Sequence, residues 1–165
     1  MKILVVFSHT YWNDSEVNRK LIESVKDFDN VKIHNLNEIY KDGKITKENI
    51  KEEIELLKEA DKIIFQFPLF WFSTPSLLKE WEDCVLGYLY HSSEKKCLEN
   101  KTFQIITTAG GEKSLYDSLE YDMNAFLSPI TLSFKDFGLK VEKTYCIYGA
   151  SLDKLDIGEY QKCFK

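Results

Sequence analysis

Apolar residues recur along the chain in two patterns that take turns, short runs and longer stripes with helical spacing. The short runs predict strands at residues 2–7, 31–36, 61–67, 102–108 and 141–147. The longer stripes predict helices at residues 15–28, 47–59, 75–89 and 120–136. The first run is continuously apolar, which is typical of a strand buried on both faces, whereas the second alternates like a strand nearer an edge.

Capping residues support two of the predicted helix starts. Asp14 or Ser15 would cap the first helix. Thr74 would cap the third, with Pro75 in the first helical position, where its missing N–H costs nothing. The tail from Ser151 predicts a short helix, and no linker or low-complexity segment interrupts the chain. We therefore expect one domain covering residues 1–165.

Strands that alternate with helices predict a parallel sheet with helices on both faces. Right-handed crossovers reduce the number of topologies, and five strands favour the flavodoxin-like order 2-1-3-4-5. We therefore predict an α/β fold, a flavodoxin-like three-layer sandwich around a five-stranded parallel sheet. Ligands of such sheets bind outside the carboxyl ends of the strands, at the switch point. A site is thus expected in the loops after strands 1, 3 and 4.

The loop after the third strand is unusually aromatic. Phe70, Trp71 and Phe72 follow Pro68 and Leu69, although apolar strands usually hand over to polar turns. Three aromatic rings at a strand's carboxyl end favour a planar ring cofactor that covers them. Aromatic residues also dominate cores and subunit interfaces, so this segment alone leaves both interpretations open.

The loop after the first strand carries candidate anion ligands. Ser8, His9, Ser15 and Asn18 precede or open the predicted helix, and a helix N-terminus favours an anion. Taken singly, Ser15 is also a plain N-cap and His9 a hydrogen-bonded loop histidine. The loop matches neither the GxxxxGK[ST] nor the GxGxxG phosphate motif, which disfavours a P-loop or a dinucleotide-binding Rossmann fold.

The loop after the fourth strand offers backbone amides. Thr107 and Thr108 lead into Gly110 and Gly111, and adjacent glycines let the backbone approach a ligand closely. In a flavin site such amides could hold the ring edge where negative charge develops on reduction. A tight turn is the alternative explanation for the glycines.

Composition narrows the function classes. The net charge is −5 and Arg19 is the sole arginine, so the basic patch of a nucleic-acid-binding protein is not visible. The apolar run at residues 2–7 is too short to span a membrane, and no signal-type cleavage pattern follows it. The four cysteines and three histidines are scattered, so we expect free thiols in a cytoplasmic, reducing compartment and no metal site.

Three segments together resemble a known family. Residues 65–81 read FQFPLFWFSTPSLLKEW, which is similar to the signature of the flavodoxin-like NAD(P)H:quinone oxidoreductases, especially their short bacterial members. This family includes the DT-diaphorase, modulator-of-drug-activity and potassium-efflux ancillary types. Residues 8–18 resemble its cofactor phosphate loop, and residues 107–111 resemble its third flavin loop. The resemblance extends to about Gly149.

The resemblance implies a set of site residues. The flavin phosphate would be held by His9, Ser15, Val17 and Asn18. The isoalloxazine ring would lie against Pro68, Leu69, Phe70, Trp71 and Phe72. Its other edge would contact Thr107, Thr108, Gly110 and Gly111. Tyr116 falls near a tyrosine that some members place over the substrate, without the histidine that follows it in the mammalian type.

The resemblance also implies an activity, a flavin-dependent transfer of hydride from NADPH or NADH to a quinone or similar flat acceptor. The two substrates would take turns at one place, a ping-pong scheme in which the cofactor does the hard chemistry. The short chain favours FMN over FAD, and a homodimer is expected.

Two other functions share this architecture. A flavin-binding regulatory subunit of a potassium-efflux transporter is compatible with the same resemblance. A flavodoxin-type electron carrier would instead show a Thr/Ser/Gly-rich phosphate loop and no aromatic ledge. A receiver domain needs paired acidic residues after the first strand, where Phe7 and Ser8 stand.

Overall fold

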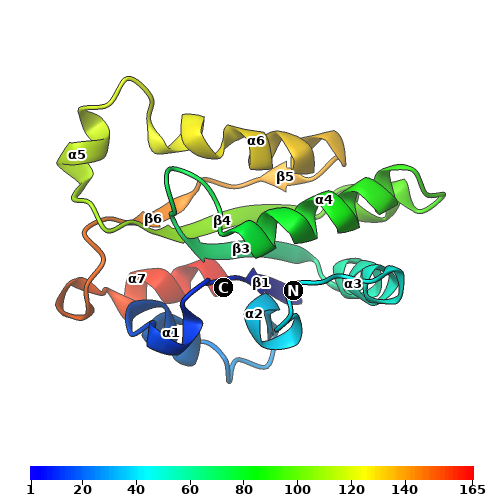
Figure 1. Cartoon of the computed structure of the whole chain (residues 1–165), viewed down its shortest axis with the longest axis horizontal. Helices are drawn as coiled ribbons and strands as arrows, with labels where there is room; N and C mark the ends of the chain where they lie inside the picture. Colours follow the sequence, from blue (N-terminus) through cyan, green and yellow to red (C-terminus); the bar gives the residue numbers. More distant parts are fainter.

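A parallel sheet forms the centre of the molecule, and the computed structural model describes all residues, 1–165 (Figure 1). The strands lie in the order β2-β1-β3-β4-β5, and β6 also pairs with β4. They are β1 (Ile3–Phe7), β2 (Val31–Asn35), β3 (Lys62–Pro68), β4 (Thr102–Thr108), β5 (Lys140–Val141) and β6 (Tyr145–Ile147). All pairs are parallel, which confirms the predicted α/β class and strand order.

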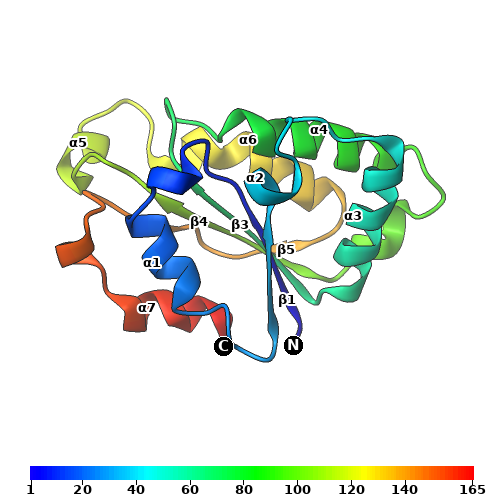
Figure 2. The same ribbon diagram turned by 60° about the horizontal axis from the view of Figure 1, so that its bottom comes forward.

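Helices cover both faces of the sheet (Figure 2). One apolar cluster joins one face to α1 (Val17–Glu23) and α7 (Ile157–Gln161). A larger cluster joins the other face to α2 (Leu36–Ile39), α3 (Lys47–Glu59), α4 (Ser76–Tyr90) and α6 (Met123–Asp136), with Tyr116 of α5 (Lys113–Asp117) among its members. Short 3₁₀ helices lie at Trp12–Asp14, Lys95–Leu98, Leu152–Lys154 and Lys162–Phe164. None of these helices is long and apolar enough to cross a bilayer.

Aromatic side chains fill the larger half of the core. Phe65 lies edge-on to Trp81, Phe103 and Phe134, with ring centroids 5.0 to 5.5 Å apart. Phe103 and Phe134 stack at 3.7 Å. Aromatic pairs in these arrangements add to the stabilisation from burying their surface. This packing holds β3, the strand that leads into the aromatic loop, against α4 and α6 on one face of the sheet.

Several local predictions differ from the structure. The first helix ends at Glu23, near Ser24, whose hydroxyl donates to the Leu21 carbonyl oxygen (2.7 Å) and so offers the backbone an alternative to the helical ladder. Its N-cap is Glu16, so neither Asp14 nor Ser15 caps it.

The other differences concern the third helix and the last strand. Pro75 itself is the N-cap of α4, because its extended ψ of 145° ends the preceding segment, and Thr74 lies outside the helix. The strand predicted at 141–147 is divided into β5 and β6. Between them Gln104 Nε2 donates to the Lys143 carbonyl oxygen at 3.0 Å, a side-chain bond where a ladder bond would otherwise form.

Candidate functional site

The carboxyl ends of β1, β3 and β4 bring their following loops together around a cleft of about 520 Å³. Nine of the residues expected at a flavin site line it: His9, Ser15, Val17, Asn18, Pro68, Leu69, Phe70, Thr108 and Gly110. Tyr11, Asp14, Glu16, Ala109 and Ala150 complete the lining. Trp71, Phe72, Thr107, Gly111 and Tyr116 do not line it.

His9 is held in one orientation at the cleft. The backbone N–H of Tyr11 donates to its Nδ1 at 3.1 Å, so the proton of the neutral ring lies on Nε2. The ring is buried, with 9% of the residue exposed, and this desolvation lowers the pKa of His9 below its ordinary value. The result is a neutral imidazole whose Nε2–H is a hydrogen-bond donor.

Ser8 does not face the cleft. Its hydroxyl donates to Asn37 Oδ1 at 3.0 Å, and the backbone N–H of His9 donates to the same oxygen at 2.8 Å. Asn37 belongs to α2, an element that the periodicity did not predict. Because the carboxyl end of β2 meets the same edge of the sheet, the polar residues after the second strand were the signal that could have identified it.

Asn18 presents a buried acceptor at the cleft. It is 3% exposed, and its Nδ2 donates to Thr108 Oγ1 at 3.0 Å. Its Oδ1 has no hydrogen-bond partner, and an unsatisfied buried acceptor costs about 1–3 kcal/mol. The N–H groups in the first turn of α1 also lack intrahelical partners. A ligand with hydroxyl donors and a terminal anion, as in a ribityl phosphate, satisfies both sets.

The aromatic loop is a tight turn with an uncommon backbone. Phe70 and Ser73 exchange two N–H to carbonyl bonds of 2.9 Å, while Trp71 and Phe72 between them have φ of 48° and 63°. Positive φ at both central positions is the conformation of a type I′ turn, which favours Asn and Gly. Trp71 is 94% exposed. Phe72 packs on Phe126 with ring centroids 4.9 Å apart.

At the end of β4 and in the loop after it, some residues line the cleft and others are buried in the core. Thr107 is fully buried and donates to the Phe67 carbonyl oxygen at 2.9 Å, so its hydroxyl joins β4 to β3. Thr108 and Gly110 line the cleft. At Gly111 a Cβ would lie 2.7 Å from a methyl carbon of Leu115 and 3.1 Å from the ring of Tyr116. That glycine therefore permits the close packing of α5.

Tyr116 lies behind the loop and is 9% exposed. Its ring is 6.4 Å from that of Phe72 and 5.4 Å from that of Tyr148. Burial raises the pKa of Tyr148 to about 12, so it stays a neutral phenol near neutral pH. No group of three or more His, Cys, Asp or Glu side chains is arranged to hold a metal ion.

Comparison with known protein sequences gives relatives of similar length. A family described as a flavodoxin-like fold matches residues 1–162. General stress protein 14 of Bacillus subtilis (strain 168) is 34% identical over 155 residues, 92% of this chain and 87% of that protein. The uncharacterized NAD(P)H oxidoreductase YrkL of the same strain is 30% identical over 163 residues, 95% and 91% of the two chains. The potassium-efflux ancillary protein KefG of Enterobacter sp. (strain 638) is 38% identical over 136 residues, 80% and 73%.

Solved structures share the fold over almost their whole length. A tryptophan halogenase from Streptomycin violaceusniger has a TM-score of 0.88 at 30% identity, covering 96% of both chains. General stress protein 14 from Treponema denticola, in complex with FMN, has a TM-score of 0.86 at 23% identity, covering 99% and 95%. An NADPH-quinone reductase from P.pentosaceus scores 0.83 at 21%, covering 100% and 98%. Because their reactions differ, the site must decide the function.

Proposed function

This chain belongs to the flavodoxin-like fold family and is an NAD(P)H oxidoreductase, and from that premise we propose that it binds FMN and transfers hydride from NADPH or NADH to a quinone or similar flat acceptor. The observation that carries the proposal is the buried, unpartnered Asn18 Oδ1 beside the open first turn of α1. Flavin supplies the two-electron hydride chemistry when bound, and the protein supplies position and electrostatics.

Different residues of the cleft would bind different parts of the cofactor. His9 Nε2–H and the N–H groups of the first turn of α1, from Val17 on, would bind the phosphate, with Ser15 adjoining them. Asn18 Oδ1 would accept from a ribityl hydroxyl. The flat wall at Pro68, Leu69 and Phe70 would lie against the ring, and the amide at Gly110 would face its polar edge. None of these roles requires a side-chain acid or base.

FMN fits better than FAD. The lining of the cleft of about 520 Å³ consists of the ring wall, the amide loop, the phosphate loop and Ala150, and the similar structure from Treponema denticola is a complex with FMN. The four cysteines are free thiols, in keeping with work in the reducing cytoplasm.

The acceptor would stack on the ring beside the Trp71–Phe72 turn, which directly follows Phe70 of the cleft lining. Tyr116 would act there through its contact with Phe72. The nicotinamide would use the same place and leave first, which gives ping-pong kinetics.

A second copy of the chain would cover some of the exposed apolar side chains in the segments after β3 and β4. Trp71, Leu115 and Tyr121 in these segments are 94%, 53% and 57% exposed, and aromatic side chains are common in subunit interfaces. The homodimer is tested by sedimentation of the wild type and of Tyr121→Asp, which should dissociate it.

The decisive test is a visible absorbance spectrum of the purified protein, with released cofactor identified by mass. Flavin bands that bleach with NADPH or NADH and return with a quinone support the proposal. A protein that takes up neither FMN nor FAD on reconstitution contradicts it. If the bands bleach but no quinone restores them, the acceptor assignment is wrong and the flavin assignment stands.

A second function is favoured by the similarity to KefG, the ancillary protein of a potassium-efflux system. A regulatory subunit would bind flavin yet act by contacting a transporter. Efflux that changes with this protein present, and persists in a variant without reductase turnover, supports that role. Single-electron transfer to a redox partner without quinone turnover would instead indicate a flavodoxin-type carrier.

A further inference from the structure

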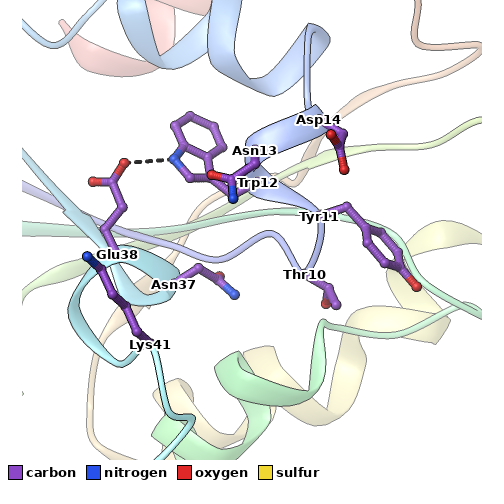
Figure 3. A pocket seen from close by; sticks show the side chains of 8 residues that line it. All are labelled: Thr10, Tyr11, Trp12, Asn13, Asp14, Asn37, Glu38 and Lys41. Atoms are coloured by element: carbon purple, nitrogen blue, oxygen red, sulfur yellow. Dashed lines mark hydrogen bonds between the residues drawn. The ribbon is translucent and has the colours of Figure 1, made fainter.

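Tyr11 and Asp14 of the phosphate loop line both the flavin cleft and a second cavity, on the side of the loop that faces α2 (Figure 3). This second cavity measures about 870 Å³ and separates the segment Thr10–Asp14 from α2 and Lys41. The loop side chains around it are exposed, apart from the half-buried Trp12. This part of the loop therefore has no apolar packing against α2, and its position depends on a few hydrogen bonds across the gap.

Asn37 makes the first of these bonds. Its Oδ1 accepts from both Ser8 Oγ (3.0 Å) and the backbone N–H of His9 (2.8 Å). These contacts fix the chain where β1 ends and the loop begins. They determine where the His9 backbone lies. The Tyr11 N–H, which donates to Nδ1, fixes the orientation of the His9 ring.

Glu38 makes the second. Its Oε1 accepts from Trp12 Nε1 at 2.7 Å, the bond drawn across the cavity in Figure 3. The indole is also held by Arg19, whose guanidinium lies 4.4 Å from its centroid and donates to the Trp12 carbonyl oxygen at 2.9 Å. Phe7 meets the ring edge-on at 5.0 Å. Trp12 is thus clamped between α1 and α2.

The helix that supplies both contacts is itself anchored. Asn35 Oδ1 caps it by accepting from the Asn37 N–H at 3.2 Å, and Leu36 is fully buried. At its end the Tyr40 hydroxyl donates to Glu53. Glu53 is 1% exposed and also accepts from His34 and Trp81, at 2.7 and 2.8 Å. A short helix held at both ends is a rigid support.

We infer that α2 positions the phosphate loop, and that Asn37 and Glu38 set the affinity for the phosphorylated flavin without touching it. The inference rests on the proposed function, since it needs the phosphate to bind at this loop. Both are positioning residues. Their effect should be strongest on the phosphate, because α2 makes no hydrogen bond to the ring wall at Pro68–Phe70, which belongs to β3 and its loop. The phosphate loop meets that wall only where His9 and Tyr11 lie edge-on to Phe70, with ring centroids 5.9 and 6.0 Å apart.

The test compares FMN with riboflavin, which lacks the phosphate, by fluorescence titration of apoprotein. Asn37→Ala and Glu38→Ala should each weaken FMN binding about tenfold, the loss expected from one or two hydrogen bonds. Riboflavin affinity should stay within about twofold of wild type. The double variant should lose at least as much as either single variant.

Matched variants distinguish the loss of the Asn37 and Glu38 hydrogen bonds from other effects of a substitution in α2. Glu38→Gln removes the charge but keeps an acceptor for Trp12, so it should restore most of the FMN affinity. Ile39→Ala changes a half-exposed neutral residue of the same helix, 49% exposed, and should bind FMN like the wild type. Urea unfolding of each variant checks that the fold is intact.

The results that would contradict the inference differ from those that would contradict the proposed function. If FMN affinity is unchanged in both alanine variants, or if FMN and riboflavin affinities fall together, α2 does not position the phosphate loop. A wild type that binds FMN no better than riboflavin contradicts the phosphate assignment of the proposed function. A wild type that binds neither overturns the proposed function and this inference with it.

Discussion

Two aromatic residues adopt a backbone conformation that their side chains disfavour. Trp71 and Phe72 have positive φ, which costs an L-residue about 1–2 kcal/mol. Strain of this kind persists where function selects the side chain. Trp71 gains little burial in return, because it is 94% exposed, so the strain indicates a role for the indole beside the cleft.

The strain and the role can be separated by two substitutions at Trp71. Trp71→Gly and Trp71→Ala both remove the indole, and both should lower flavin retention or quinone turnover to the same extent. Only glycine relieves the positive φ. Urea unfolding should therefore show Trp71→Gly more stable than Trp71→Ala by about 1 kcal/mol. An alanine variant of equal or greater stability would mean that the turn is not left-handed in solution.

The buried His9 should make the apoprotein sensitive to acid. Burial lowers the pKa of His9 in the folded state, so the unfolded chain binds more protons below the usual histidine value of about 6.5. Stability is then unaffected well above that value, falls as the pH drops through it, and levels off below the lowered pKa. Urea unfolding from neutral to mildly acidic pH should show this decline, and His9→Gln should flatten it. Parallel curves for the two proteins would contradict the neutral imidazole.

At the scale of elements, Glu53 of α3 joins four parts of the molecule. It accepts from His34 of β2, Tyr40 after α2 and Trp81 of α4. Burial alone would raise the pKa of Glu53, but these donors outweigh it and hold that pKa below its ordinary value. A buried carboxylate with three donors remains ionised at neutral pH.

Removing the Glu53 charge should lower the free energy of unfolding far more than removing an exposed charge. Glu53→Gln leaves buried donors facing an amide N–H₂, and the free energy of unfolding should fall by about 2–4 kcal/mol. The exposed pair of Lys113 and Asp117 is the comparison, and Asp117→Asn should change stability little. Equal losses in the two variants, measured by urea unfolding, would show that the Glu53 cluster adds nothing beyond an ordinary surface ion pair.

Elements were predictable from the sequence where local and tertiary signals agreed. The helix at Lys47–Glu59 has the predicted bounds, because its stripe of apolar residues begins at a capping box formed by Thr46 and Asn49. The helix α2 was not predicted, since four residues are too few to show a period, and its anchor Glu53 belongs to another helix, 13 residues beyond Tyr40. Without α2, Asn37 could be identified only from its place after the second strand, at the carboxyl edge of the sheet.

At the scale of the whole molecule, alternation of strands and helices was enough to predict the sheet order and the edge that carries the site. Chain topology brings the loops after β1, β3 and β4 to one cleft, wherever their side chains point. The orientations were not predictable: Ser8 and Thr107 turn away from the cleft to bond Asn37 and Phe67. Those choices depend on partners that only the folded chain brings close.

Because the cleft draws on three strand ends, a ligand bound there stabilises the whole folded domain. FMN at about a hundred times its Kd should raise the free energy of unfolding by about 2.7 kcal/mol. Riboflavin at the same concentration should raise it less, since it lacks the phosphate that His9 and α1 would bind. Thermal unfolding over a range of flavin concentrations measures both effects. Equal stabilisation by the two flavins would place the phosphate outside the loop after β1, whereas a larger effect of FMN supports the site as proposed.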